Sequence, residues 1–73
     1  MELNKVTVKR MQGTEDVFIA SIALNNHPSR PRLLGRIQTD DQEQINKFVR
    51  SHVLYAVQNG CDFELGSFVP YTL

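Results

Sequence analysis

Side chains that carry catalytic chemistry are few in this chain and far apart in its sequence. His27 and His52 fall on different predicted elements, and no serine stands in a nucleophile-elbow motif. No dinucleotide-binding, Walker, HExxH or calcium-loop motif occurs. Cys61 is the single cysteine, which excludes an internal disulfide, a cysteine zinc site and a CxxC redox pair. We therefore expect no enzyme activity, no cofactor and no metal site.

Four residues with reactive side chains each have a structural interpretation beside the chemical one. His52 falls within an apolar helical stripe, where a histidine is either packed and hydrogen-bonded to backbone or acts as a pH switch or base. Asp40 and Asp41 form a carboxylate pair at a predicted helix start, which helix capping explains. Cys61 is either a small, partly buried apolar residue or a reactive thiol. In each case we favour the structural interpretation.

Arginine side chains gather around a proline-rich segment. Residues 25–31 (NNHPSRP) contain two Asn, two Pro and one Ser, which predicts a loop. Arg30 and Arg32 flank Pro31, and their guanidinium groups can bind a phosphate or a carboxylate. The alternative is that both side chains are simply solvated. Arg36 follows within the next predicted strand.

The segment at residues 16–24 (DVFIASIAL) is apolar on both faces of a predicted strand. Phe18 belongs to one row of side chains, and Val17 and Ile19 belong to the other. A strand covered on one face does not need a second apolar row, so the second row predicts a partner-binding surface. The alternative is that neighbouring long side chains and the C-terminal tail shield Val17 and Ile19.

Two other regions extend the predicted partner surface. Leu54 lies on the polar face of the helix with Tyr55 nearby, where it can anchor a contact. The tail after residue 66 is apolar, and Pro70 keeps it out of the middle of a sheet, so it docks at an edge or crosses to a second chain. The predicted partner-binding residues are Val17, Ile19, Arg30, Arg32, Arg36, Leu54, Phe68 and Tyr71.

Charge is unevenly distributed although the formal net charge is zero. Residues 1–38 carry six basic and three acidic side chains, and residues 39–73 carry two basic and five acidic ones, giving +3 and −3. A sheet backed by a helix can enter a nucleic-acid groove with its exposed face, which Lys5, Lys9, Arg32 and Arg36 would line. The zero net charge and the absence of interleaved aromatic residues make nucleic acid the alternative partner.

Three strands are expected to position these groups. Residues 3–11 alternate, with Val6 and Val8 on one face, and a turn around Gly13 leads to the second strand at residues 16–24. Residues 32–38 form the third strand, with Leu33 and Ile37 on one face and Gly35 marking a bulge or a close backbone approach.

A helix at residues 39–60 is expected to cover one face of this sheet. Thr39 is the predicted N-cap with Gln42 completing a capping box, and Gly60 is the predicted left-handed stop. Its apolar stripe comprises Ile45, Phe48, Val49, His52, Val53, Ala56 and Val57. The alternating segment CDFEL after Gly60 then returns as a short fourth strand.

These elements predict one α+β domain over residues 1–73, with a three-stranded antiparallel meander, one helix and a short C-terminal strand. The chain begins without the apolar run of a signal peptide, so we expect a soluble cytoplasmic protein. Its sparse chemistry and apolar second strand predict a small interaction or regulatory protein, an adaptor or inhibitor of the bacterial or phage accessory type. A chain this short has a thin core, which favours a homodimer.

Overall fold

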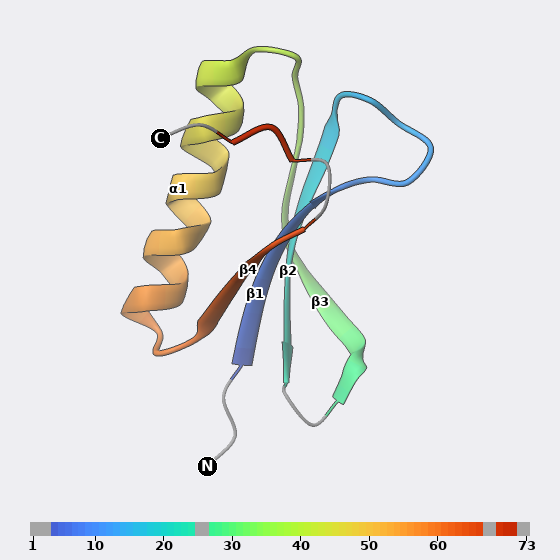
Figure 1. The fold of residues 1–73 in the computed structure, drawn as a ribbon. Helices are drawn as coiled ribbons and strands as arrows, with labels where there is room; N and C mark the ends of the chain where they lie inside the picture. The colour runs from blue at the N-terminus through green and yellow to red at the C-terminus, as the bar shows by residue number, and fades with distance from the viewer. Residues whose placement is uncertain (1–3, 25–26, 67–68, 72–73) are drawn as a thin grey trace.

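The chain folds as a four-stranded β-sheet with one helix packed against one face (Figure 1). The computed structural model describes residues 4–24, 27–66 and 69–71, with residues 24 and 27–30 described by their backbone only. Strands β1 (Asn4–Arg10), β2 (Val17–Leu24) and β3 (His27–Gln38) precede helix α1 (Gln42–Gln58) and strand β4 (Asp62–Leu65). The sheet order is β3-β2-β1-β4, and β4 runs parallel to β1. This confirms the predicted α+β class and the β-β-β-α-β order.

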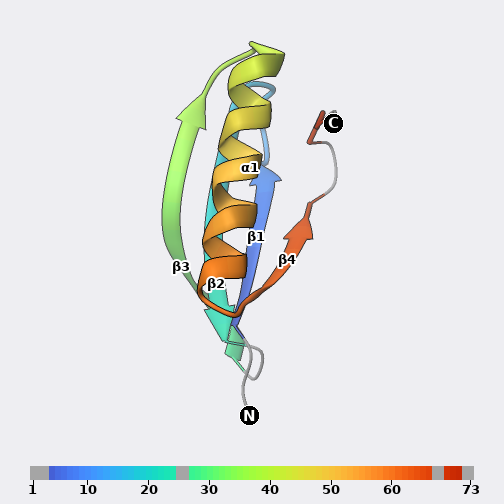
Figure 2. The ribbon, with the colours of Figure 1, turned by 90° about the vertical axis from the view of Figure 1, so that its left-hand side faces the viewer.

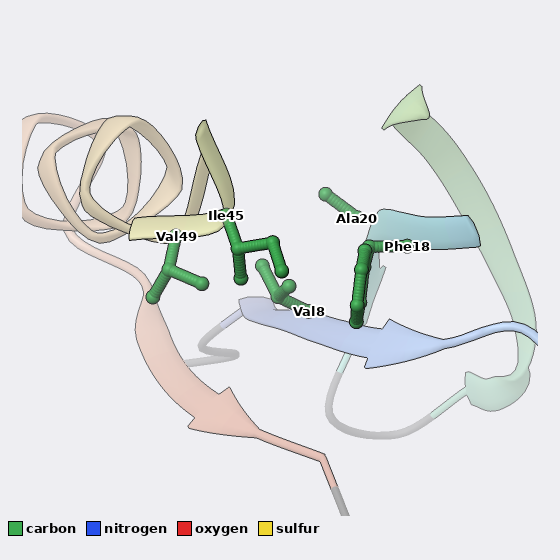
Figure 3. Close-up of a cluster of buried hydrophobic side chains, with 5 residues drawn as sticks. All are labelled: Val8, Phe18, Ala20, Ile45 and Val49. Atoms are coloured by element: carbon green, nitrogen blue, oxygen red, sulfur yellow. The ribbon is translucent and has the colours of Figure 1, made fainter. Parts of the chain in front are cut away.

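The core lies between α1 and the two central strands. Val8 from β1, Phe18 and Ala20 from β2, and Ile45 and Val49 from α1 form one buried cluster between the helix and the sheet (Figure 3). Because side chains alternate along a strand, burying these residues turns their neighbours toward the opposite face of the sheet. The two faces of the sheet therefore differ sharply in what they present.

Strand β3 differs from its sequence prediction in two ways. It begins at His27, so the predicted loop at residues 25–31 is wrong for residues 27–31; residues 25 and 26 lie outside the described residues. Prolines are compatible with β3 because it is an edge strand, where a missing N–H need not break the ladder. The residue before each proline is also pushed to extended backbone.

A register shift beside Gly35 confirms the bulge predicted there, and the second difference in β3 is the face on which this bulge places Leu33. Ala20 pairs with Gly35 and Ser21 pairs with Leu33, which makes Leu34 the extra residue of a bulge. The predicted common face for Leu33 and Ile37 is therefore wrong. Ile37 packs against the core, whereas Leu33 lies beside Ser21 on the opposite face.

Helix α1 begins two residues later than predicted, and Asp41 is its N-cap rather than Thr39. The backbone of Thr39 still belongs to the sheet, because its N–H donates to Asp16 O at 2.8 Å. Asp41 is extended, and its carboxylate accepts from the Glu43 N–H at 3.0 Å, which satisfies one free helix donor. Thr39 lies just before the cap and holds its backbone, because the Thr39 hydroxyl oxygen accepts from the Asp41 N–H at 3.1 Å.

The end of α1 confirms Gly60 as the left-handed stop. Asn59 is the C-cap, and Gly60 has φ of 65°. The Cys61 N–H donates to Ala56 O at 2.8 Å and the Gly60 N–H donates to Val57 O at 3.3 Å. This pair of bonds is the Schellman arrangement, which requires positive φ at Gly60 and satisfies two terminal carbonyls.

The buried side of α1 is narrower than the predicted stripe. Ile45, Val49 and Ala56 are buried, and Phe48, His52 and Val53 are partly buried. Val57 is 71% exposed, so its predicted place in the core is wrong. At 100° per residue Val57 turns about 40° beyond Val53, to the outer edge of the stripe.

Strand β4 forms as predicted at Asp62–Leu65 and lies at the edge opposite β3. Beyond it, the Gly66 N–H donates to Val8 O at 2.8 Å and continues the pairing with β1. Val69 and Tyr71 then pack against the core of the same chain, and the Gln42 side-chain amide donates to the Pro70 carbonyl. The described part of the tail therefore docks on its own chain.

Candidate interaction surface

The face of the sheet turned away from α1 has no helix over it among the described residues (Figures 1 and 2). We call this surface the outer face. Its side chains are those that alternate with the buried ones on β1 and β2, together with their cross-strand neighbours on β3 and β4. They are Lys5, Thr7, Lys9, Ile19, Ser21, Ala23, Leu33 and Arg36, with Asp62 and Glu64 on β4.

Apolar side chains lie in the middle of the outer face and basic ones flank them. Lys9, Ile19 and Arg36 are direct cross-strand neighbours on β1, β2 and β3. In the adjacent row, Leu33 lies beside Ser21 and is 60% exposed. Ile19 is half-buried, while Lys9 and Arg36 are exposed. The outer face therefore combines apolar contact area with two accessible cations.

Acidic side chains occupy the β4 side of the same face. Lys5 Nζ lies 3.5 Å from Glu64 Oε2, and the two side chains are 43% and 59% exposed. A pair this accessible contributes little to stability, because water and salt screen it. The outer face thus carries the basic Arg36 at its β3 edge, Lys5 and Lys9 on β1, and two acidic side chains at its β4 edge.

The turn between β1 and β2 borders the outer face at one end. Gly13 has φ of 83°, as a tight turn requires, and the Thr14 hydroxyl donates to Met11 O at 2.7 Å. A depression of about 530 Å³ lies between this turn and the strands β1 and β4, lined in part by Lys9 and Glu64. Met11 is 44% exposed at its rim.

Three predicted partner-binding residues lie away from the outer face or beneath its surface. Val17 is only 4% exposed, which accords with shielding by neighbouring side chains and removes it from the accessible surface. Tyr71 is half-buried against the core of its own chain. Leu54 is 57% exposed but lies on α1, on the other side of the molecule. The Arg30 side chain and Phe68 lie outside the described residues.

The four predicted nucleic-acid-binding residues do not share one face. Lys5, Lys9 and Arg36 are on the outer face, but Arg32 pairs with Ile22, which is in the row of the buried Val6. The bulge at Leu34 causes this split, because one extra residue reverses the alternation between Arg32 and Arg36.

Arg32 instead borders a depression that α1 and the first three strands line together. This depression measures about 570 Å³ and includes Ile22, Leu34 and Tyr55 in its lining. It lies where the C-terminal half of α1 passes the β2–β3 end of the sheet. Asn4 and Arg32 belong to its lining, and Arg32, which is exposed, is the charged residue among those that line it.

His52 has the packed, backbone-bonded environment that was the favoured interpretation. Its Nδ1 lies 2.7 Å from Phe48 O, and since a carbonyl can only accept, Nδ1 carries the hydrogen. The rings of Phe48 and His52 have centroids 4.5 Å apart. A Cβ on Gly35 would lie 3.4 Å from His52 Nε2, so the histidine packs directly over this glycine.

Leu33 is the main outer-face residue that sequence reasoning missed. The regular alternation of a strand assigns Leu33 to the same face as Gly35 and Ile37, and therefore to the core. Gly35 indicated a bulge, but a glycine does not fix which neighbour becomes the extra residue. A bulge at Leu34 is what brings Leu33 outward.

Comparisons with protein-family models, curated proteins and solved structures gave no match. Among the described residues, no group of three or more His, Cys, Asp or Glu side chains is placed to hold a metal ion. Over residues 4–24, 27–66 and 69–71, no helix has both the length and the apolar character needed to cross a bilayer.

Proposed function

We propose that this chain is a non-enzymatic interaction protein, an adaptor or inhibitor, that binds proteins through the outer face of its sheet. The observation that carries the proposal is the arrangement of Ile19 and Leu33 on a face without a helix, flanked by Lys9 and Arg36. Apolar area surrounded by charge is the usual composition of a protein-binding surface, since the centre gains from losing water while the rim stays hydrated.

The first partner in this proposal is a second copy of the chain. On the outer face Arg36 lies on β3 at one edge of the sheet, and Asp62 and Glu64 lie on β4 at the other edge. A two-fold axis parallel to the strands places β3 of one copy over β4 of the other, so opposite charges face each other across the interface. Sheets stacked in this way also bury the apolar middle of the outer face on both copies.

Nucleic acid is the second candidate partner, because Lys9 and Arg36 lie in one cross-strand row with Ile19. Two observations weigh against it. Arg32 lies on the other side of the sheet, and Lys5 is paired with Glu64. A mobility-shift assay at low salt tests this candidate, and binding that weakens steeply with added salt would favour it over the protein partner.

Matched variants on the two sides of the molecule test the protein-binding proposal. Leu33 and Leu54 are similarly exposed, at 60% and 57%, but Leu33 is on the outer face and Leu54 is on α1. We expect a tagged wild-type chain and Leu54→Asp to capture the same protein from the native host, and Leu33→Asp to lose it. Equal capture by Leu33→Asp, or loss with Leu54→Asp alone, contradicts the proposal.

A further inference from the structure

Among the described residues no strand pairs with the free edge of β3, because β3 is the last strand in the order β3-β2-β1-β4. Figure 2 shows β3 beside α1 rather than beneath it. An edge strand presents backbone N–H and C=O groups that can pair with another strand. Whether β3 can accept a strand depends on which of its residues point those groups outward.

Two backbone hydrogen bonds fix this orientation for the second half of β3. The Thr39 N–H donates to Asp16 O at 2.8 Å, so these two residues form a hydrogen-bonded pair between β2 and β3. Hydrogen-bonded and non-hydrogen-bonded pairs alternate along an antiparallel ladder. The next residue on β3, Gln38, is therefore in a non-hydrogen-bonded pair with Val17, and its own N–H and C=O point away from β2.

A bond on the other side of β2 gives the same assignment. The Met11 N–H donates to Val17 O at 2.8 Å, so Val17 directs this carbonyl toward β1 rather than toward β3. Two residues further along, Ile19 and Arg36 also form a non-hydrogen-bonded pair, so the N–H and C=O of Arg36 point away from β2 as well. Arg36 and Gln38 thus turn two N–H and two C=O groups toward the open edge.

The side chains beside this edge determine which residue types a bound strand would need. On the outer face, Arg36 is exposed and β3 contains no acidic residue to pair with it. On the helix side, Leu34, Ile37 and Phe48 pack against the core but remain only partly buried. A strand added here would set alternate side chains beside Arg36 and beside this apolar group, because alternate residues of a strand face opposite sides.

We propose that the β3 edge binds an extended segment of a partner protein in which acidic and apolar residues alternate. Its acidic side chains pair with Arg36 across the strands, and its apolar side chains cover Leu34, Ile37 and Phe48. This binding mode adds one strand to an existing sheet, with backbone bonds supplying affinity and alternate side chains supplying selectivity. The inference rests on the proposed interaction function and names the chemistry of the partner.

A second β3 strand is a poor occupant of this edge. Antiparallel pairing of two β3 strands would bring the Arg36 side chains of both copies onto the same face of one short ladder that contains no acidic residue. Like charges on neighbouring strands destabilise the pairing. Strand β4 has the required alternation in Asp62, Phe63, Glu64 and Leu65, but one of its edges is already paired with β1. Assembly through β4 of another copy is therefore an outcome to be tested.

The test uses the full chain and two capped, fluorescein-labelled seven-residue peptides, one alternating Glu with Val and one alternating Lys with Val. Fluorescence anisotropy measures binding. We expect the Glu peptide to bind and the Lys peptide to bind at least tenfold more weakly. Arg36→Glu, which leaves the backbone intact, should reverse this preference. No binding of the Glu peptide, or a preference unaffected by Arg36→Glu, would overturn the inference.

Two variants at one position test the role of the backbone. Gln38→Pro removes the outward N–H and Gln38→Ala keeps it, while both remove the same side-chain bond to Asp16. We expect Gln38→Pro to weaken binding of the Glu peptide about tenfold relative to Gln38→Ala, with circular dichroism confirming that both are folded. Equal affinity of the two variants would overturn strand addition, and an unfolded Gln38→Pro leaves the Arg36→Glu result as the deciding one.

Two further outcomes separate this inference from the proposed function. If the Glu peptide fails to bind while Leu33→Asp still abolishes partner capture, the outer-face function stands and the edge inference falls. If light scattering shows open-ended assembly of the chain that Arg36→Glu abolishes, β4 of another copy occupies the edge, and the partner segment is wrong.

Discussion

Gly66 lies where the chain leaves β4 against β1, and replacing it with alanine tests the packing of these two strands. An ideal Cβ at this position would lie 2.8 Å from Lys9 Cβ, 3.2 Å from Lys9 Cα and 3.1 Å from Val8 O. Carbon atoms in contact prefer separations of about 3.5–4.0 Å, so the added methyl lies more than half an ångström too close to Lys9 Cβ. Backbone atoms and a Cβ cannot rotate away, so the strands must separate.

The cost of Gly66→Ala follows from that separation. Overpacking typically costs about 1–3 kcal/mol, and weakening the 2.8 Å bond from Gly66 N to Val8 O adds about 1 kcal/mol. Alanine also reduces the conformational freedom of the unfolded chain, which stabilises the folded state by about 0.4–1 kcal/mol. We therefore expect a net loss of about 2 kcal/mol in the free energy of unfolding. For a domain of this size that corresponds to a melting temperature lower by roughly 8–16 °C.

Gly35→Ala is the matched control for this prediction. A Cβ at Gly35 would have His52 Nε2 as its nearest neighbour at 3.4 Å, and a side-chain ring can adjust. Urea unfolding followed by circular dichroism measures both variants, and Gly35→Ala should change the unfolding free energy by less than about 1 kcal/mol. A Gly66→Ala chain as stable as the wild type, or less affected than Gly35→Ala, would refute the reasoning.

Two further predictions concern α1 and use the same unfolding assay. Asp41→Ala should lower the free energy of unfolding by about 1 kcal/mol because it removes the N-cap acceptor, and Thr39→Ala should cost less; the reverse order would restore Thr39 as the cap. Val49→Ala should cost about 2 kcal/mol because the side chain is 1% exposed, whereas Val57→Ala, at a position 71% exposed, should stay within about 0.5 kcal/mol. Equal costs would contradict the orientation of the helix.

The sequence predicted those features that depend on local pattern. Alternation placed Val6 and Val8 in the core, and the Asn-Gly pair at residues 59 and 60 marked the end of α1 correctly. Both signals depend only on the period of one element or on the backbone freedom of one glycine. The fold class followed because each element had a pattern of its own.

Features that depend on pairing between strands could not be predicted in the same way. The extra residue at Leu34 is fixed by how β3 meets β2, and it decides the faces of Leu33 and Arg32. The early start of β3 at His27 depends on its position at the sheet edge, where Pro28 and Pro31 are tolerated. The face of the sheet was therefore predicted correctly for Ile19 and Arg36, and incorrectly for Leu33 and Arg32, which precede the bulge on β3.

The proposed function requires that this chain bind proteins through the outer face, beginning with its own second copy. Light scattering after gel filtration, on the wild type, Leu33→Asp and Leu54→Asp, is the decisive measurement. We expect about twice the chain mass of 8.4 kDa for the wild type and Leu54→Asp, and the single-chain mass for Leu33→Asp. A single-chain mass for all three proteins at high concentration, or dissociation by Leu54→Asp alone, would contradict it.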